Sequence, residues 1–216
     1  MNNHNTRSPG KLFVVSAPSG AGKTSLVKAL IDRRPELRVA VSHTTRKRRR
    51  DEVDGVNYHF VDTQTFTAMQ EAGAFIESAH IFGNLYGTSQ AEVNRILGTG
   101  HHIILEIDWQ GAAQVRQNLD NVISIFILPP SLETLKMRLL TRAQDDLETI
   151  TARFNAAISE IAHYKDFDYL IVNDNFEDAV ADLERIIFDE GKDRSLAVQE
   201  QQQASLIAQL LPDADK

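Results

Sequence analysis

Short, almost entirely apolar runs alternate along this chain with stretches in which apolar residues recur every three or four positions. The first run, Leu12–Ser16, ends at a glycine-rich turn and predicts a strand that is buried on both faces. The helical spacing of apolar residues within 26–31 then predicts a helix that ends before Pro35. Residues 38–42 predict a second short strand.

The same alternation returns in the second half of the chain. Three further strands are predicted, at residues 103–107, 123–128 and 169–172. Helices are predicted at residues 111–117, 132–142, 147–164 and 179–187. Strands that alternate with helices form right-handed βαβ units, so we predict an α/β fold with a mostly parallel sheet flanked by helices.

Three segments do not follow this alternation. Residues 42–90 are polar and basic, with several aromatic residues, and we predict that they form a lobe inserted outside the main sheet. Residues 1–10 have no periodicity and are predicted to be a disordered lead-in. Residues 191–216 carry an apolar stripe that ends in Leu210 and Leu211, and they predict a tail helix. Loose packing of this helix on the core is the favoured interpretation, and a contact between subunits is the alternative.

Composition narrows the class of protein. The chain has 216 residues, of which 42% are hydrophobic and 25% are charged, as expected for one globular domain with insertions. The net charge of −7 argues against general binding to nucleic acid or to anionic membranes. Without cysteine, the chain has neither a disulfide framework nor a cysteine-ligated zinc site. It also has no secretory signal pattern and no apolar run of about 20 residues, so the cytoplasm is the expected location.

The strongest motif lies directly after the first strand. Residues 16–24 read SAPSGAGKT and open the first predicted helix, which is the context that a P-loop requires. Gly20 and Gly22 allow the backbone to approach phosphate oxygens without a Cβ clash, and the helix N-terminus presents N–H donors to the anion. Lys23 supplies a positive charge near the β- and γ-phosphates, and Thr24 supplies a hydroxyl group for Mg²⁺.

One position departs from the strict P-loop pattern, because Ala17 stands where the pattern has its first glycine. Alanine can adopt most backbone conformations there, so we retain the P-loop interpretation over an ordinary glycine-rich turn. A P-loop identifies the phosphoryl donor but leaves the acceptor open, so GTPases, helicase-like ATPases and kinases all remain candidates at this point.

Three further features bear on the acceptor. The basic run 46–50 contains guanidinium groups that match phosphate oxygens, although a solvated basic face or a nuclear-import patch is an equal alternative. Glu77 and the hydroxyl-rich segment 83–89 belong to the same predicted lobe, and Glu77 could instead be a surface carboxylate. Asp108 follows a buried strand at the sheet edge where α/β proteins bind ligands, or it is a simple cap.

Taken in order and spacing, the motifs SAPSGAGKTSL, SHTTR, DGVNYHF, FIE, YGTS, EIDWQGA, IFILPPS and YLIVND resemble the bacterial guanylate kinase family over about residues 11–190. The resemblance implies a P-loop nucleoside monophosphate kinase fold. It would have a core of residues 11–41, 91–137 and 165–190, a GMP-binding lobe at 42–90 and a helical lid at 138–164. It also implies transfer of the γ-phosphoryl group of ATP to GMP, giving ADP and GDP, with Mg²⁺ as cofactor. It leaves use of dGMP and homo-oligomer formation open, and neither nucleic acid nor membrane is an expected partner.

The resemblance assigns roles to individual residues. The expected ATP-binding residues are Ala17, Pro18, Ser19, Gly20, Ala21, Gly22, Lys23, Thr24, Ser25 and Asn173. The GMP phosphate is assigned to Arg46, Arg49, Tyr58 and Tyr86, and the guanine base to Ser42, Glu77, Thr88 and Asp108. The expected catalytic residues are Lys23 and Arg46 together with the lid arginines Arg138, Arg142 and Arg153. Thr24 is expected to hold Mg²⁺ with the ATP phosphates, and a contribution from Glu106 or Asp108 stays open.

Each assignment has an alternative. The lid arginines could be helix-surface charges, and Asn173 could be an ordinary turn residue. Arg48 and Arg50 occupy positions where the family usually has proline, so no phosphate contact is assigned to them. A binding module without activity would be expected to lose Lys23 and Thr24. A kinase for a phosphorylated sugar would be expected to lack Glu77 and Thr88, and this chain has both pairs.

Overall fold

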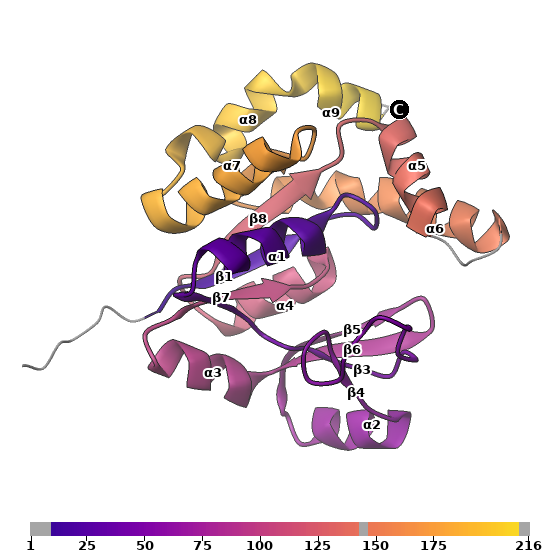
Figure 1. Ribbon diagram of the computed structural model, residues 1–216, viewed down its shortest axis with the longest axis vertical. Coiled ribbons are helices and arrows are strands. Elements are labelled where there is room, and N and C mark those ends of the chain that lie inside the picture. Colours follow the sequence, from indigo (N-terminus) through magenta and orange to yellow (C-terminus); the bar gives the residue numbers. More distant parts are fainter. Residues whose placement is uncertain (1–9, 143–146, 212–216) are drawn as a thin grey trace, which may run out of the picture. The chain divides into compact units, whose positions relative to one another are not determined.

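The computed structural model describes residues 10–142 and 147–211 of the chain (Figure 1). The predicted lead-in at 1–10 lies outside these ranges except for Gly10. The chain divides into two compact units, which we describe separately. The first unit comprises Met1–Val14 and Pro35–Ile123, and the second comprises Val15–Arg34 and Ser124–Lys216.

Two sheets are present, one with the strand order β2-β7-β1-β8-β9 and one with the order β4-β3-β6-β5. The strands are β1 (Leu12–Ser16), β2 (Leu37–Val39), β3 (His43–Thr44), β4 (His59–Phe60), β5 (Phe75–Ile81), β6 (Asn84–Ser89), β7 (His102–Glu106), β8 (Ile123–Leu128) and β9 (Tyr169–Val172). In the first sheet, β2 pairs with β7 and β8 pairs with β9, both in parallel. The predicted α/β fold with a mostly parallel sheet is confirmed.

Helices are present at the five positions predicted before the tail, and two further helices, Thr63–Glu71 and Gln90–Gly98, were not predicted. The helices are α1 (Lys23–Arg33), α2 (Thr63–Glu71), α3 (Gln90–Gly98), α4 (Trp109–Asn118), α5 (Leu132–Arg142), α6 (Leu147–Ile161), α7 (Phe176–Asp189), α8 (Leu196–Gln202) and α9 (Ala204–Leu210). The helix predicted at 147–164 ends earlier, and a 3₁₀ turn at Ala162–Asp166 completes it. None of the described helices is both long and apolar enough to cross a bilayer.

In the first unit, the second sheet is built entirely from residues of the predicted lobe. Strands β5 and β6 form an antiparallel hairpin, β3 pairs antiparallel with β6, and α2 packs against β5 (Figure 1). The hairpin turn consists of Phe82 and Gly83, both with positive φ, as a type I′ turn requires. Inside the lobe, the ring of Phe66 is fully buried and stacks on Phe75 with a centroid distance of 4.6 Å.

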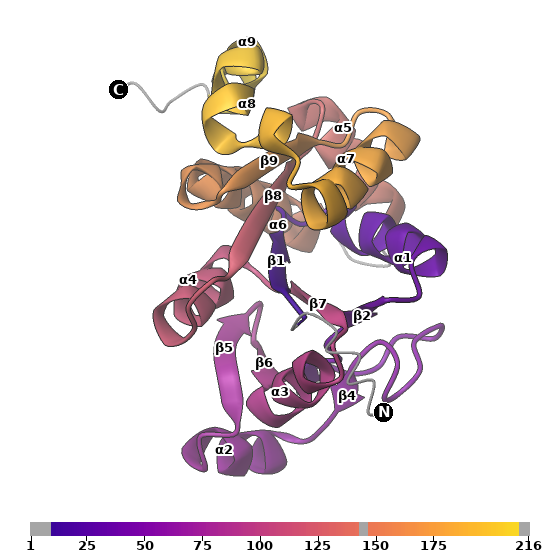
Figure 2. The same ribbon diagram turned by 90° about the vertical axis from the view of Figure 1, so that its left-hand side faces the viewer.

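In the second unit, α1 packs against α7, and both views show these helices side by side (Figure 2). The buried face of α7 is formed by Ala179, Val180, Leu183, Ile186 and Ile187. The residue before the helix, Asn175, is its N-cap, and its side chain accepts hydrogen bonds from the N–H groups of Glu177 and Asp178. This apolar face therefore accounts for the helical pattern predicted at 179–187.

The tail differs from the predicted single helix. A 3₁₀ turn at Lys192–Arg194 precedes two short helices, α8 and α9. Residues 199–205 contain no large apolar side chain, so no apolar stripe runs through the whole tail and the helix breaks within it. Packing on the unit is nevertheless substantial, because Leu210 is fully buried and the hydroxyl group of Tyr164 donates to Glu200 at 2.9 Å.

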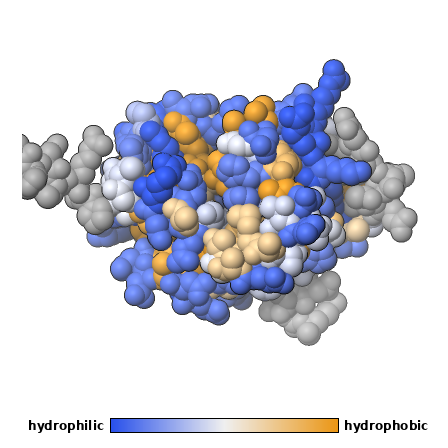
Figure 3. Space-filling view, turned by 90° about the horizontal axis from the view of Figure 1, so that it is seen from below, coloured by the Kyte–Doolittle hydropathy of each residue, from blue (hydrophilic) through white to orange (hydrophobic). Residues whose placement is uncertain are grey.

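The surface seen from below is largely hydrophilic, with groups of hydrophobic residues between the hydrophilic ones (Figure 3). The large hydrophobic residues that are most exposed in the lobe are Val53, Val56 and Phe82. The hydrophobic core lies inside the units, and β1 is buried along its whole length.

We expect Phe66→Ala to destabilise the lobe by about 3–5 kcal/mol, because it removes a fully buried ring and leaves a cavity beside Phe75. Val56→Ala is the control, since Val56 is 67% exposed, and it should change the free energy of unfolding by less than about 0.5 kcal/mol. Urea unfolding followed by circular dichroism measures both values. Similar effects for the two variants would contradict the described core.

Candidate functional site

The P-loop lies in the second unit, between β1 and α1. Residues 17–22 form the turn, and residues 23–25 form the first turn of α1. Gly20 and Gly22 have φ values of 91° and 97°, in the left-handed region that glycine adopts without a Cβ penalty. Gly22 is the N-cap residue, so α1 begins at Lys23 with no side chain of its N-cap covering the helix end. This is the end of a helix at which anions bind.

The side chain of Asn173 binds the backbone of the P-loop. Asn173 follows β9, is 3% exposed, and its Nδ2 atom donates to the carbonyl oxygen of Ala21 at 2.7 Å. A Cβ atom on Gly22 would lie 2.4 Å from the same Nδ2 atom, so the position requires glycine for space as well as for conformation. The expected contact of Asn173 with adenine stays a prediction, and its side-chain nitrogen binds the P-loop backbone.

The three arginines assigned to the lid differ in position. Arg138 on α5 lies at the P-loop, with Nη1 at 3.4 Å from the carbonyl oxygen of Ala21 and Nη2 at 3.3 Å from that of Asn173. Arg153 lies on α6 and is half-buried. Arg142 is the last residue of α5, and its side chain lies outside the described part of the structure.

A carboxylate also reaches the P-loop, and the sequence analysis did not include it. The N–H group of Ser19 donates to Oε2 of Glu160 at 3.1 Å, and Glu160 lies near the end of α6. An acidic residue occurs at many positions of a helix surface, and 141 residues separate this pair, so no local pattern could have indicated the contact.

The residues assigned to guanine come together in the first unit. Glu77 on β5 pairs in register with Thr88 on β6, and the two residues are 4% and 0% exposed. The hydroxyl oxygens of Ser42 and Thr88 are 2.9 Å apart. The strand register shifts between Phe75 and Glu77, which is a bulge of the kind that re-aims a side chain.

Gly111 is the second feature that the sequence analysis did not assign. Its N–H group donates to Oδ1 of Asp108 at 2.8 Å, which makes Asp108 the cap of α4. A Cβ atom on Gly111 would lie 2.7 Å from Oε2 of Glu77 and 3.3 Å from Oδ1 of Asp108. The two carboxylates therefore converge on this glycine, and Asp108 acts both as a helix cap and as a neighbour of Glu77.

The residues assigned to the GMP phosphate also gather in the first unit. The guanidinium carbon of Arg46 lies 5.4 Å from the ring centroid of Tyr58 and 5.8 Å from that of Phe60. The rings of Tyr58 and Tyr86 meet edge to face at 5.9 Å. Arg49 is half-exposed on the turn that follows. Two basic residues and two phenols of this kind suit a phosphate group.

The surroundings of Arg46, Glu52 and Tyr58 shift the pKa of each side chain. Burial opposes the charge of Arg46, but its hydrogen bond and ion pair with Glu52 outweigh burial and raise its pKa. Burial also opposes the charge of Glu52, but the bonds from Arg46 and Arg49 hold the pKa of this carboxyl group below its usual value. The pKa of Tyr58 is raised, first by burial and then by Tyr86 and Glu106, so its hydroxyl group remains a donor.

The donor set suits a metal that is held mainly by phosphate and water. No group of three histidine or acidic residues that could hold a metal ion occurs among the described residues. Thr24 in the first turn of α1 offers a hydroxyl group instead, and Mg²⁺ keeps several waters and takes few protein ligands.

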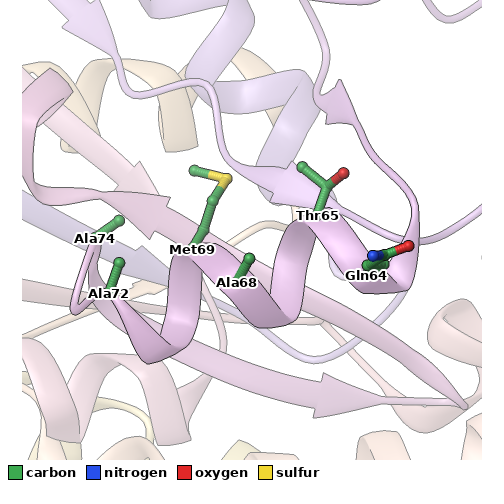
Figure 4. A pocket seen from close by; sticks show the side chains of 6 residues that line it. All are labelled: Gln64, Thr65, Ala68, Met69, Ala72 and Ala74. Carbon is green, nitrogen blue, oxygen red and sulfur yellow. The ribbon is translucent and has the colours of Figure 1, made fainter.

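A shallow pocket elsewhere contains none of the predicted site residues. It lies along α2 and the following turn and is lined by Gln64, Thr65, Ala68, Met69, Ala72 and Ala74 (Figure 4). Its lining has no charged group, so it does not suit a nucleotide phosphate.

A buried strand, a turn with two glycines of positive φ, and a lysine and threonine that open a helix define the class of P-loop nucleotide-binding proteins. Within this class, the mostly parallel sheet and the lobe inserted after β2 match the predicted fold of a P-loop nucleoside monophosphate kinase.

Comparisons with known proteins agree with this fold class and identify the family. The family model described as guanylate kinase matches residues 9–190. A guanylate kinase of Pseudomonas fluorescens is 55% identical over 208 residues, covering 95% of this chain and 99% of the relative. That of Alcanivorax borkumensis is 52% identical over 202 residues, covering 94% and 97%. A crystal structure of guanylate kinase from Anaplasma phagocytophilum matches with a TM-score of 0.72 and 32% identity, over 93% of this chain and 97% of that chain. The chain belongs to the guanylate kinase family.

We expect Gly111→Ala to raise the KM for GMP by about 10-fold or more while the KM for ATP stays unchanged. The added Cβ atom would force the Glu77 carboxylate out of its position, and a lost charge-assisted hydrogen bond costs about 1.5–3 kcal/mol. Gly98→Ala is the matched control, since Gly98 also lies in a helix and a Cβ atom there meets nothing within 4 Å. Steady-state kinetics with each nucleotide varied in turn measures the effect, and an unchanged KM for GMP would contradict the described pocket.

Proposed function

We propose that this chain transfers the γ-phosphoryl group of ATP to GMP, giving ADP and GDP, with the second unit binding ATP and the first unit binding GMP. Membership of the guanylate kinase family supports this reaction. The observation that carries the assignment of the acceptor is the buried Glu77 carboxylate, which lies opposite Thr88 in a lobe that also contains Arg46. Mg²⁺ as cofactor and the cytoplasm as compartment belong to the same proposal.

The chemistry of guanine fits the pocket. Guanine presents N1–H and its 2-amino group side by side, and one carboxylate can accept from both. Adenine presents an acceptor at N1, which a carboxylate would repel. A buried carboxylate that finds no donor is costly, so a site of this kind discriminates strongly against bases that lack the two donors.

The donor side fits ATP. The backbone N–H groups of the glycine turn and the start of α1 bind phosphate oxygens, and Lys23 adds charge at the β- and γ-phosphates. Arg138 is close enough to the P-loop to neutralise charge on the transferring group. Mg²⁺, when bound with Thr24 and the phosphates, supplies further charge neutralisation.

The reaction needs little covalent help from the protein. The transition state spreads negative charge over three equatorial oxygens, so positioning and charge neutralisation carry the catalysis. The acceptor oxygen on the GMP phosphate and the γ-phosphorus of ATP must meet in line with water excluded, because water would otherwise accept the phosphoryl group. We propose that the helical lid, with Arg138, Arg142 and Arg153, provides this closure.

An assay of ADP production with GMP, AMP, CMP, UMP and ribose phosphates as acceptors tests the function. GMP should be preferred by a large factor. Preference for a ribose phosphate would favour a sugar-phosphate kinase, and the absence of ADP production with every acceptor would favour a binding module.

Lys23→Ala should lower the rate of transfer by roughly 10²-fold or more, a loss of about 2.7 kcal/mol in transition-state stabilisation. The melting temperature and circular dichroism should be nearly unchanged, because Lys23 lies at the start of α1 outside the buried face of that helix. A variant with a nearly normal rate would contradict the P-loop assignment.

The basic run allows a residue-level prediction. Arg46→Ala or Arg49→Ala should raise the KM for GMP by roughly 10-fold or more, since charge-assisted bonds to phosphate are worth about 1.5–3 kcal/mol. Arg48→Pro and Arg50→Pro should change it little, because both arginines are exposed and exposed charges contribute about 0–1 kcal/mol. Kinetics at fixed ionic strength compares the four variants. Equal losses would indicate a diffuse basic patch.

A further inference from the structure

Glu52 binds both arginines of the proposed phosphate pocket. Its Oε1 atom accepts from Nη2 of Arg46 at 2.6 Å, and its Oε2 atom accepts from the backbone N–H group of Arg49 at 2.8 Å. The Nη1 atom of Arg49 lies 4.0 Å from Oε1. One carboxylate therefore uses both oxygens to connect the side chain of one arginine with the backbone of the other.

The environment makes this contact more than a surface ion pair. The side chains of Arg46 and Glu52 are each only 15% exposed. Nη1 of Arg46 donates to the carbonyl oxygen of Lys47 at 2.8 Å, and the guanidinium group lies against the rings of Tyr58 and Phe60. The N–H group of Glu52 also donates to the carbonyl oxygen of Arg49 at 3.2 Å, which closes the turn that carries Arg49.

This arrangement has two opposite effects on the binding of GMP. An unfixed arginine side chain loses rotamer entropy when it is immobilised, so a guanidinium group that is already fixed binds phosphate better. A carboxylate beside that guanidinium group, however, repels the phosphate dianion. The sign of the net effect decides whether Glu52 assists GMP binding or competes with it.

We infer that Glu52 is a positioning residue for the GMP phosphate: it fixes the Arg46 guanidinium group and the Arg49 turn in the orientation that receives the phosphate. The inference rests on the proposed function. The contacts favour positioning over competition, because Oε2 is bound to a backbone N–H group and because the rings of Tyr58 and Phe60 and the Lys47 carbonyl group hold Arg46 from other sides.

The test compares the binding of GMP and of guanosine, measured by calorimetry, in three variants. Glu52→Ala should raise the Kd for GMP by about 10-fold, because both acceptor oxygens are lost. Glu52→Gln should give a smaller rise of about 3-fold, since one amide oxygen can replace only one of the two acceptors. Asp51→Ala removes a neighbouring exposed carboxylate and should change the Kd by less than about 2-fold.

Guanosine separates positioning from damage to the lobe. It carries the base without the phosphate, so its Kd should be the same in Glu52→Ala and in the unchanged protein. An equal loss of guanosine and GMP binding would overturn the inference in favour of a structural role. Tighter binding of GMP by both Glu52 variants would overturn it in favour of competition, because both variants remove the same negative charge.

A double-mutant cycle shows through which residue Glu52 acts. If Glu52 acts partly through Arg46, Glu52→Ala should raise the Kd for GMP less in the Arg46→Ala background than in the unchanged protein. Fully additive losses would overturn that route. Failure of the proposed function has a different signature, because Arg46→Ala alone would then leave GMP binding unchanged, whereas failure of this inference leaves the Arg46 effect intact.

Discussion

A phosphate-binding turn must point its backbone N–H groups at an anion, and a turn made of small residues has few side-chain contacts with which to hold that shape. The second unit meets this constraint from outside the turn. The carbonyl oxygen of Ala21 accepts from Asn173 at 2.7 Å and lies near Arg138, and the N–H group of Ser19 donates to Glu160. A buried hydrogen bond from a side-chain amide, such as that of Asn173, stabilises the folded state by about 1 kcal/mol, but its loss would leave buried polar groups unpaired.

The first unit meets a related constraint with one buried and one partly buried carboxylate. Glu77 is 4% exposed, and space for its carboxylate exists because position 111 has no Cβ atom. Glu52 is held by Arg46 and by the backbone of Arg49. In both units the residues that we propose to bind a nucleotide are fixed by neighbouring residues, and such preorganisation reduces the entropy lost when a ligand binds.

Most of the fold could be predicted from the sequence, because the spacing of apolar residues is a local signal for helices and strands. The strand at 12–16 and the helix at 132–142 have the predicted bounds, and Glu77, Thr88 and Ser42 lie together as the motifs implied. The supporting contacts could not be predicted in the same way. Glu52 acts across a turn, Glu160 acts across 141 residues, and the importance of Gly111 depends on which side chain fills the space beside it. The roles of Arg142, Arg153 and the adenine contact of Asn173 stay predictions.

The division of the second unit along the chain has a consequence for biosynthesis. Arg33 and Arg34 at the end of α1 bind Glu177 and Glu184 on α7, partners that are 144 and 150 residues further on. At about 5–20 residues per second, a ribosome needs roughly 7–30 s to produce those partners after α1 has been made. During that interval the P-loop helix has no α7 to cover its apolar face. The nascent chain therefore leaves Leu26, Val27 and Leu30 without α7 during this interval, which gives a chaperone time to act on α1.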